Sequence, residues 1–270
     1  MADEKQLEQL RQGIEHWNRW RKERDDYERD RLDDPEDEIG GPDLSGINLS
    51  GNNLSGILFY DADLSGVNLS DTDLSGADLG CANLSGANFN RTNLENANLV
   101  NANLSGANFT GANLTGANLP HANFSNATLN NADLMFVTME QIILTGASLI
   151  GANLYGATIK YANLNHADLS RADLRHTTLY KTTFREAKLT AVSIGYTIFA
   201  DIDLRQTIGL ETIIPEGPLT IGIDTLLRSG GNLPKSFFSQ AGLAFDPARS
   251  PDEIIKTCIL TLSKIVKEQK

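Results

Sequence analysis

A five-residue period runs without interruption from Asp43 to Arg205 and constrains the fold more than any other feature of this chain. When the register is set on Leu44 and advanced in steps of five, 33 central positions follow up to Leu204: 24 are Leu, six Phe, two Ile and one is Met139. Two residues before each centre lies a second position, which is Ala in 19 of these units and mostly Val, Ile or Thr in the others. The remaining three positions are predominantly Asn, Asp, Ser, Thr or Gly.

A period of five fits neither a helix, whose apolar residues recur every 3.6 positions, nor a strand, whose apolar residues alternate. The chain must therefore turn regularly, so that the central and Ala positions point inward and the polar positions face water. Glycine recurs two residues after the centre, at the proposed corners, where a positive φ relieves strain. These glycines are Gly46, Gly56, Gly66, Gly76, Gly86, Gly106 and Gly116.

The motif A-[DN]-L-S-G resembles the pentapeptide-repeat family. It reads A-N-L-S-G at 102–106, A-N-L-T-G at 112–116 and A-D-L-S-R at 167–171, and the resemblance covers about three-fifths of the chain. The resemblance implies a mainly β fold, a right-handed quadrilateral β-helix with four repeat units per coil. The 33 units would then form about eight coils.

The two ends depart from the repeat, and we expect α-helical caps there because an open solenoid end exposes unpaired backbone. Three regions are expected: an N-terminal amphipathic helix and acidic linker at 1–41, the β-helix at 42–208 and a C-terminal helical segment at 209–270. Residues 5–30 are predicted to form one helix over the first coil. Within it, L-R-Q-G-I-E-H-W-N-R-W-R resembles the segment that often opens bacterial pentapeptide-repeat proteins. The acidic run that follows is interpreted as a solvated linker because it lacks calcium-loop spacing.

Three helices are predicted after Arg205, at about 219–228, 234–241 and 251–268. The last has an N-cap Ser, a Pro at the first helical position and Glu253 at the third. Its apolar face consists of Ile254, Ile255, Cys258, Ile259, Leu262, Ile265 and Val266. Residues 222–238 also resemble a segment that joins pentapeptide repeats to a TIR-type domain in bacterial proteins. This sequence departs from that arrangement by ending at Lys270, so the resemblance carries over no TIR-type activity.

The sequence contains no recognisable arrangement of residues for catalysis, nucleotide binding or metal binding. Serine is abundant because the repeat uses it, the four histidines lie on unrelated sides, and no nucleotide-binding loop or zinc-ligand spacing is found. We therefore expect a protein that is not an enzyme, with no catalytic residue, cofactor or metal. The chain has no membrane-length apolar run and no hydrophobic signal core at its start, so we expect a cytoplasmic location and no membrane contact.

Large side chains accumulate in the later repeats at positions where Ser, Gly or Asn is usual. If coils contain twenty residues, as the resemblance implies, Phe136, His176 and Tyr196 share one column, and Tyr161 and Lys181 share another. The candidate protein-binding patch consists of Met135, Phe136, Ile143, Tyr155, Tyr161, Arg175, Tyr180 and Tyr196. Aromatic and Arg side chains are the types that anchor interfaces. Two other interpretations are equally open: terminal helices cover these sides, or the stacked rings only stabilise the coils.

Charge also varies along the repeat, although the chain as a whole carries −12. The first coils are acidic, with a candidate acidic surface made of Asp61, Asp63, Asp71, Asp73 and Asp78. The last coils are basic, with Lys160, Arg171, Arg175, Lys181, Arg185, Lys188 and Arg205.

The main functional hypothesis is a non-catalytic scaffold or adaptor that binds a protein partner of unknown identity. The alternative comes from the family resemblance: some members inhibit or protect DNA gyrase, a type II topoisomerase, by imitating duplex DNA as acidic rods. The basic far end fits that alternative less well. A further alternative is a partner of a bacterial defence or signalling effector. Direct nucleic-acid binding is disfavoured by the net acidity, and the C-terminal helices could also mediate a homodimer.

Overall fold

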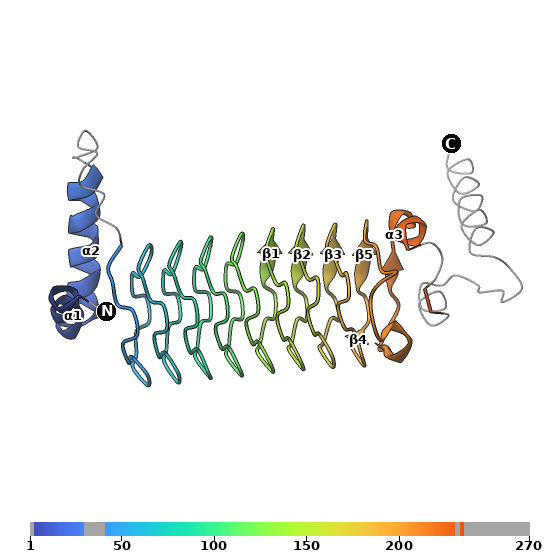
Figure 1. Ribbon diagram of the computed structural model, residues 1–270, viewed down its shortest axis with the longest axis horizontal. Coiled ribbons are helices and arrows are strands. Elements are labelled where there is room, and N and C mark those ends of the chain that lie inside the picture. Colours follow the sequence, from blue (N-terminus) through green and yellow to red (C-terminus); the bar gives the residue numbers. More distant parts are fainter. Residues whose placement is uncertain (1–2, 30–40, 230–232, 235–270) are drawn as a thin grey trace, which may run out of the picture.

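The computed structural model describes residues 3–29, 41–229 and 233–234, which form a rod of stacked coils with helices at both ends (Figure 1). The helices are α1 (Glu4–Arg11), α2 (Ile14–Arg29) and α3 (Ile223–Arg228), with the 3₁₀ turn η1 (Leu210–Thr212). The strands are β1 (Thr138–Glu140), β2 (Thr158–Lys160), β3 (Thr178–Tyr180), β4 (Ser193–Ile194), β5 (Ile198–Ala200), β6 (Ile214–Pro215) and β7 (Thr220–Ile221). The acidic run at 33–38, the helix predicted at 234–241 apart from Pro234, and the helix predicted at 251–268 lie outside the described residues.

Each coil contains twenty residues, because parallel backbone bridges join every rung to the residue twenty positions later. One such ladder passes through eight levels: Asp43, Asp63, Asn83, Asn103, Asn123, Ile143, Asn163 and Thr183. Four five-residue units therefore make one turn, with one unit on each side of the rod. The predicted fold class, a mainly β solenoid with helices at its ends, is confirmed.

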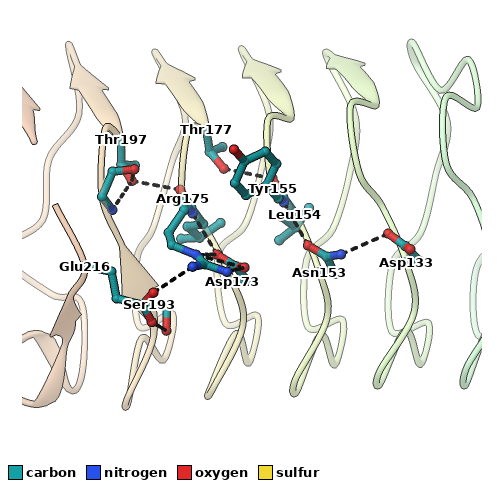
Figure 2. Close-up of polar contacts among 12 residues, drawn as sticks. Asp133, Asn153, Leu154, Tyr155, Asp173, Arg175, Thr177, Ser193, Thr197 and Glu216 are labelled. Carbon is teal, nitrogen blue, oxygen red and sulfur yellow. Dashed lines mark hydrogen bonds and ion pairs between the residues drawn. The ribbon is translucent and has the colours of Figure 1, made fainter.

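The interior is filled by the central and Ala positions. Leu104 and Ala112, from two different sides of the same coil, are 0% and 1% exposed. Larger central residues stack along the axis, as Phe89 and Phe109 do with their ring centroids 4.5 Å apart. A Thr in the Ala position is tolerated because its hydroxyl donates a hydrogen bond to the coil below. The Thr177 hydroxyl, for example, donates to the Leu154 carbonyl oxygen at 2.9 Å (Figure 2).

The position before each centre, here called the ladder position, carries a second set of hydrogen bonds on the outside. The Asn153 Nδ2 donates to Asp133 Oδ1 of the preceding coil at 3.2 Å (Figure 2). The Asn153 Oδ1 in turn accepts from the Tyr155 backbone N–H at 3.1 Å. One short amide thus links two coils and caps a turn, which explains why the repeat uses Asn and Asp there.

The corners predicted from the glycines are confirmed. Gly46 and the equivalent residues have positive φ, and so do non-glycine residues at the same position, such as Phe136 (φ 57°) and Tyr161 (φ 55°). A left-handed backbone costs an L-residue roughly 1–2 kcal/mol. The fold therefore accepts large side chains at these corners at an energetic cost.

The single N-terminal helix predicted over 5–30 was wrong, since the segment forms two helices, α1 and α2. The chain turns at Gly13, whose φ of 101° lies outside the helical region, and its N–H bonds to the Leu10 carbonyl oxygen at 3.0 Å. A backbone that can adopt positive φ is the usual end of a helix.

The helix pair covers the first coil. Trp17 is fully buried, lies edge-on against Phe59 at 5.6 Å and donates from Nε1 to the Leu58 carbonyl oxygen at 2.7 Å. Asn18 donates to Gly56 O at 2.9 Å and accepts from the Leu58 N–H at 2.9 Å. These side chains replace the coil that would otherwise pair with this edge. Throughout the described ranges, no helix has the length and apolarity needed to cross a bilayer.

At the other end, parallel pairing continues beyond the boundary expected at residue 208. Strand β4 pairs with β6 and β5 pairs with β7, but the connecting coil is longer than twenty residues, because Ser193 faces Ile214 and Ile198 faces Thr220. The extra residues include η1, and they hide the period from sequence inspection. The helix predicted at 219–228 is therefore shorter: β7 occupies its start and α3 its end.

Helix α3 closes the final coil with two buried hydroxyl groups. Thr225 Oγ1 accepts from the Ile202 N–H at 3.2 Å, and Ser229 Oγ accepts from the Leu204 N–H at 3.1 Å. Thr225 also donates to the Phe199 carbonyl oxygen at 3.1 Å. Both ends of the rod thus satisfy their last backbone groups with helix side chains.

Replacing Trp17 by Ala removes both the largest buried side chain of the N-terminal cap and its hydrogen bond. We expect Trp17→Ala to lower the free energy of unfolding by about 3–5 kcal/mol, measured by urea unfolding followed by circular dichroism. Trp20→Ala is the matched control, because Trp20 is only partly buried. An equal loss in both variants would contradict the role assigned to Trp17.

Candidate protein-binding surface

One side of the rod carries the five-stranded parallel sheet β1-β2-β3-β5-β7, here called the sheet face. The corner residues just before and just after each strand are where most of the predicted patch lies. The aromatic surface is defined as this face with its two corners: Phe136, Tyr155, Arg175, His176 and Tyr196 on one corner, and Tyr161, Tyr180 and Lys181 on the other. The structure thus brings seven of the eight predicted patch residues, all but Ile143, onto the two edges of one face.

The first corner is a continuous column of rings. The Phe136 and Tyr155 centroids are 5.9 Å apart with the rings perpendicular, Tyr155 and His176 are 4.8 Å apart, and His176 stacks on Tyr196 at 4.7 Å. Phe136 and Tyr196, at the two ends, are 59% and 57% exposed. Glycines beneath the rings allow this packing, since a Cβ on Gly156 would lie 2.6 Å from the Phe136 ring.

Arg175 supports this column rather than facing solvent freely. Its guanidinium binds Asp173 at 2.6 Å and Glu216 at 2.7 Å, and lies 5.9 Å from the centre of the Tyr155 ring (Figure 2). Partial burial of Asp173 opposes its ionisation, but the hydrogen bonds and the positive charge of Arg175 together outweigh burial and lower the pKa of this carboxyl. Ser193 completes the cluster by donating to Glu216 at 3.1 Å. Arg175, which was predicted to anchor a partner protein, therefore already forms ion pairs with two carboxylates of its own chain.

The second corner combines two tyrosines with a lysine. Tyr161 and Tyr180 meet edge to face with centroids 5.4 Å apart. The Lys181 Nζ lies 5.3 Å from the Tyr180 ring centre and 5.8 Å from that of Tyr161. Tyr161 is 46% exposed, so this cluster presents an aromatic face to solvent.

Two predicted patch residues are not members of these two clusters, and sequence reasoning missed one residue. Met135 is half-buried on the first corner beside Phe136, and Ile143 lies on the adjacent side of the rod, where it occupies a ladder position between Asn123 and Asn163. The missed residue is Ile198 in β5, an exposed apolar residue between the corners. Ile198 could have been identified from the sequence, because, like Ile143, it replaces the usual Asn or Asp at a ladder position.

The acidic side chains of the first coils mostly serve the fold. Three of them accept a hydrogen bond from an Asn of the next coil: Asp63 from Asn83 at 3.0 Å, Asp73 from Asn93 at 3.0 Å and Asp78 from Asn98 at 2.8 Å. The same three carboxylates accept a turn N–H two residues later.

The other two predicted acidic residues lie at corners. The Asp71 carboxylate forms a two-pronged pair with Arg91, both N···O distances being 2.7 Å. This hydrogen-bonded cation lowers the pKa of Asp71. Asp61 is exposed at a corner with φ 57°.

A cavity of about 500 Å³ opens beside the last coil. Among the described residues, the column of parallel bridges that passes through Thr183 is not continued to Asp203. The backbone of the last coil bonds instead to side chains at α3 and its C-terminal end, and the cavity lies at this break. Its lining includes Lys181, Arg185 and Arg228 together with Asp201 and Asp203. Asp201 pairs with Lys181 and Arg228, and Asp203 pairs with Arg205. Within the described ranges, no group of three His, Cys, Asp or Glu side chains is placed to hold a metal.

The family model "Pentapeptide repeats (8 copies)" matches residues 43–80, 77–116, 107–146, 132–171 and 167–206, more than half of the chain. The chain belongs to the pentapeptide-repeat family. The matched segments coincide with the regular coils and stop where the coil lengthens. No curated protein matches the chain significantly.

Several solved pentapeptide-repeat structures resemble this chain. HetL from the cyanobacterium Nostoc sp. strain PCC 7120, involved in heterocyst differentiation regulation, is 25% identical, covers 67% of this chain and 86% of its own, and has a TM-score of 0.36. QnrB1, a plasmid-mediated fluoroquinolone resistance protein, is 18% identical over 76% of this chain and 97% of its own, with a TM-score of 0.49. A protein from the Arabidopsis thaliana thylakoid lumen is 35% identical over 37% of this chain and 66% of its own, with a TM-score of 0.24.

The Asp71–Arg91 pair makes a direct prediction about acidity on the first coils. Arg91→Gln removes the cation that stabilises the ionised carboxyl, so the pKa of Asp71 should rise toward its ordinary value. Carboxyl ¹³C NMR titration measures this shift. The pKa of Asp73, which is lowered by hydrogen bonds from Ser75, should not change. A constant pKa at Asp71 would show that the pair does not form in solution.

Proposed function

We propose that this pentapeptide-repeat protein is a non-catalytic scaffold that binds a protein partner through the aromatic surface. The observation that carries the proposal is the exposure of Phe136, Tyr161 and Tyr196 at corners where the first coils mostly have Gly, Asp or Asn. Exposed aromatic clusters on a folded surface are typical of interaction sites.

The rigidity of the surface supports the same conclusion. The rings contact one another along the rod, and the Arg175 ion pairs and the cation of Lys181 hold them from the side. Binding to side chains that are already ordered loses little conformational entropy. The filled interior gives the rod a structural role, with its variable chemistry confined to outward positions.

The gyrase alternative receives less support from the geometry. A rod that imitates duplex DNA needs carboxylates displayed toward the enzyme. Here Asp63, Asp73 and Asp78 accept ladder hydrogen bonds, and Asp71 is neutralised by Arg91. The same outward surfaces become basic toward the other end of the rod.

Removing two rings tests the proposed function. We expect Tyr155→Ser with Tyr161→Ser to reduce capture of specific partners at least about tenfold, because buried aromatic anchors often contribute 2 kcal/mol or more each. Pull-down from the native host with quantitative mass spectrometry measures this loss. Ile150→Ser is the matched control, since Ile150 is 37% exposed on the side opposite the sheet face. The same proteins captured in the same amounts by wild type and the double variant would contradict the proposal.

A further inference from the structure

We infer that residues 251–268 of the same chain dock on the aromatic surface and cover it. The inference deepens the proposed function, on which its regulatory meaning rests, because a partner would then have to displace this segment. It is carried by three observations: the place where the described chain ends, the length of the remaining chain and the apolar face expected in it.

The described chain ends at the same end of the rod as the aromatic surface. Its last described residues are Leu233 and Pro234, and Leu233 is 6% exposed and packed against the core. The aromatic surface occupies the last regular levels, from Phe136 to Tyr196, next to α3 (Figure 1). The remaining 36 residues therefore start close to the surface rather than at the far end of the rod.

The connecting chain is long enough to reach every part of the surface. Residues 235–250 could span about 50 Å when extended and roughly 22 Å as a flexible coil. The levels from Phe136 to Tyr196 extend over only about 15 Å at a strand spacing of ~4.8 Å. Attachment to the same chain gives an effective concentration in the millimolar range, so a weak contact would suffice.

The chemistry of the two partners is complementary. The helix predicted at 251–268 has seven apolar residues on one face, and an isolated helix of this length is marginal in water unless that face is covered. A helix of this length is about 27 Å long and would extend along the whole column of exposed rings. Ile198 and the rings at the two corners offer it an apolar strip. A second copy of the chain is the competing occupant, and the experiment separates the two.

Disulfide trapping tests the docking without any partner. The native Cys258 lies on the predicted apolar face, and Cys81 is removed by Cys81→Ser. Thr178→Cys places a thiol on the sheet face, and Ser170→Cys, the matched control, places one at the same level on the opposite side. Under mild oxidation of the full chain, we expect the disulfide from residue 178 to Cys258 to form at least tenfold faster than that from residue 170. The rate should not change with dilution, and Leu262→Asp should slow it about tenfold.

Two results would overturn the inference. Equal rates for the two thiols would show that the segment does not prefer the aromatic surface. Covalent dimers whose yield falls on dilution would assign the surface to a second copy. Neither result bears on the proposed function, which is decided by partner capture alone. If the disulfide forms but capture does not depend on Tyr155 and Tyr161, the docking stands and the proposed function fails.

Discussion

The twenty-residue register of the backbone ladder is the constraint on which the rest of the molecule depends. Because each rung bonds to the rung twenty residues later, every position of the five-residue unit meets the same surroundings at every level. Central residues always meet central residues, and an Asn at a ladder position usually finds a side-chain oxygen one coil below, as Asn153 finds Asp133. One insertion would move every later side chain to a different place. The period is therefore kept wherever the regular coil is needed, and it is abandoned only at the last coil.

The same register leaves two outward positions free to vary, namely the corner and the residue before it. Their backbone is fixed by the turn, so a change of side chain there alters the surface without altering the core. Rings placed one coil apart then stack, as His176 and Tyr196 do. The corners accept these rings at a local cost in backbone energy, because Phe136 and Tyr161 adopt positive φ. A cost in backbone energy at several neighbouring corners is understandable if the surface has a function. Binding a protein is the function that fits exposed aromatic side chains.

The interior and the corners could be predicted from the sequence because both follow the period. The position of Leu104, Ala112 and Gly46 in the coil required only the register. The break at Gly13 could not be predicted from apolar spacing, since α1 and α2 together show an almost continuous amphipathic pattern. Pairing of β6 and β7 with the last regular coil was also missed, because the extra residues around η1 remove the period while the backbone ladder continues.

The candidate site was predictable in outline but not in detail. Spacing by twenty placed Phe136, His176 and Tyr196 in one column, and the structure adds that the Tyr155 ring contacts both Phe136 and His176. It could not show that Arg175 is bound by Glu216, which lies beyond the repeat and reaches it only because the last coil is longer. Nor could it show that Asp73 and Asp78 serve the ladder, since Asp and Asn alternate freely at that position.

The most direct test of the central claim is the accessibility of a thiol placed in the Ala column. In a background of Cys81→Ser and Cys258→Ser, Ala112→Cys should react with a maleimide only after unfolding in urea, because Ala112 is 1% exposed inside the coil. Ser105→Cys, on an outward position, should react in the native protein. If Ala112→Cys reacted as fast as Ser105→Cys in the native state, the filled four-sided coil would be wrong.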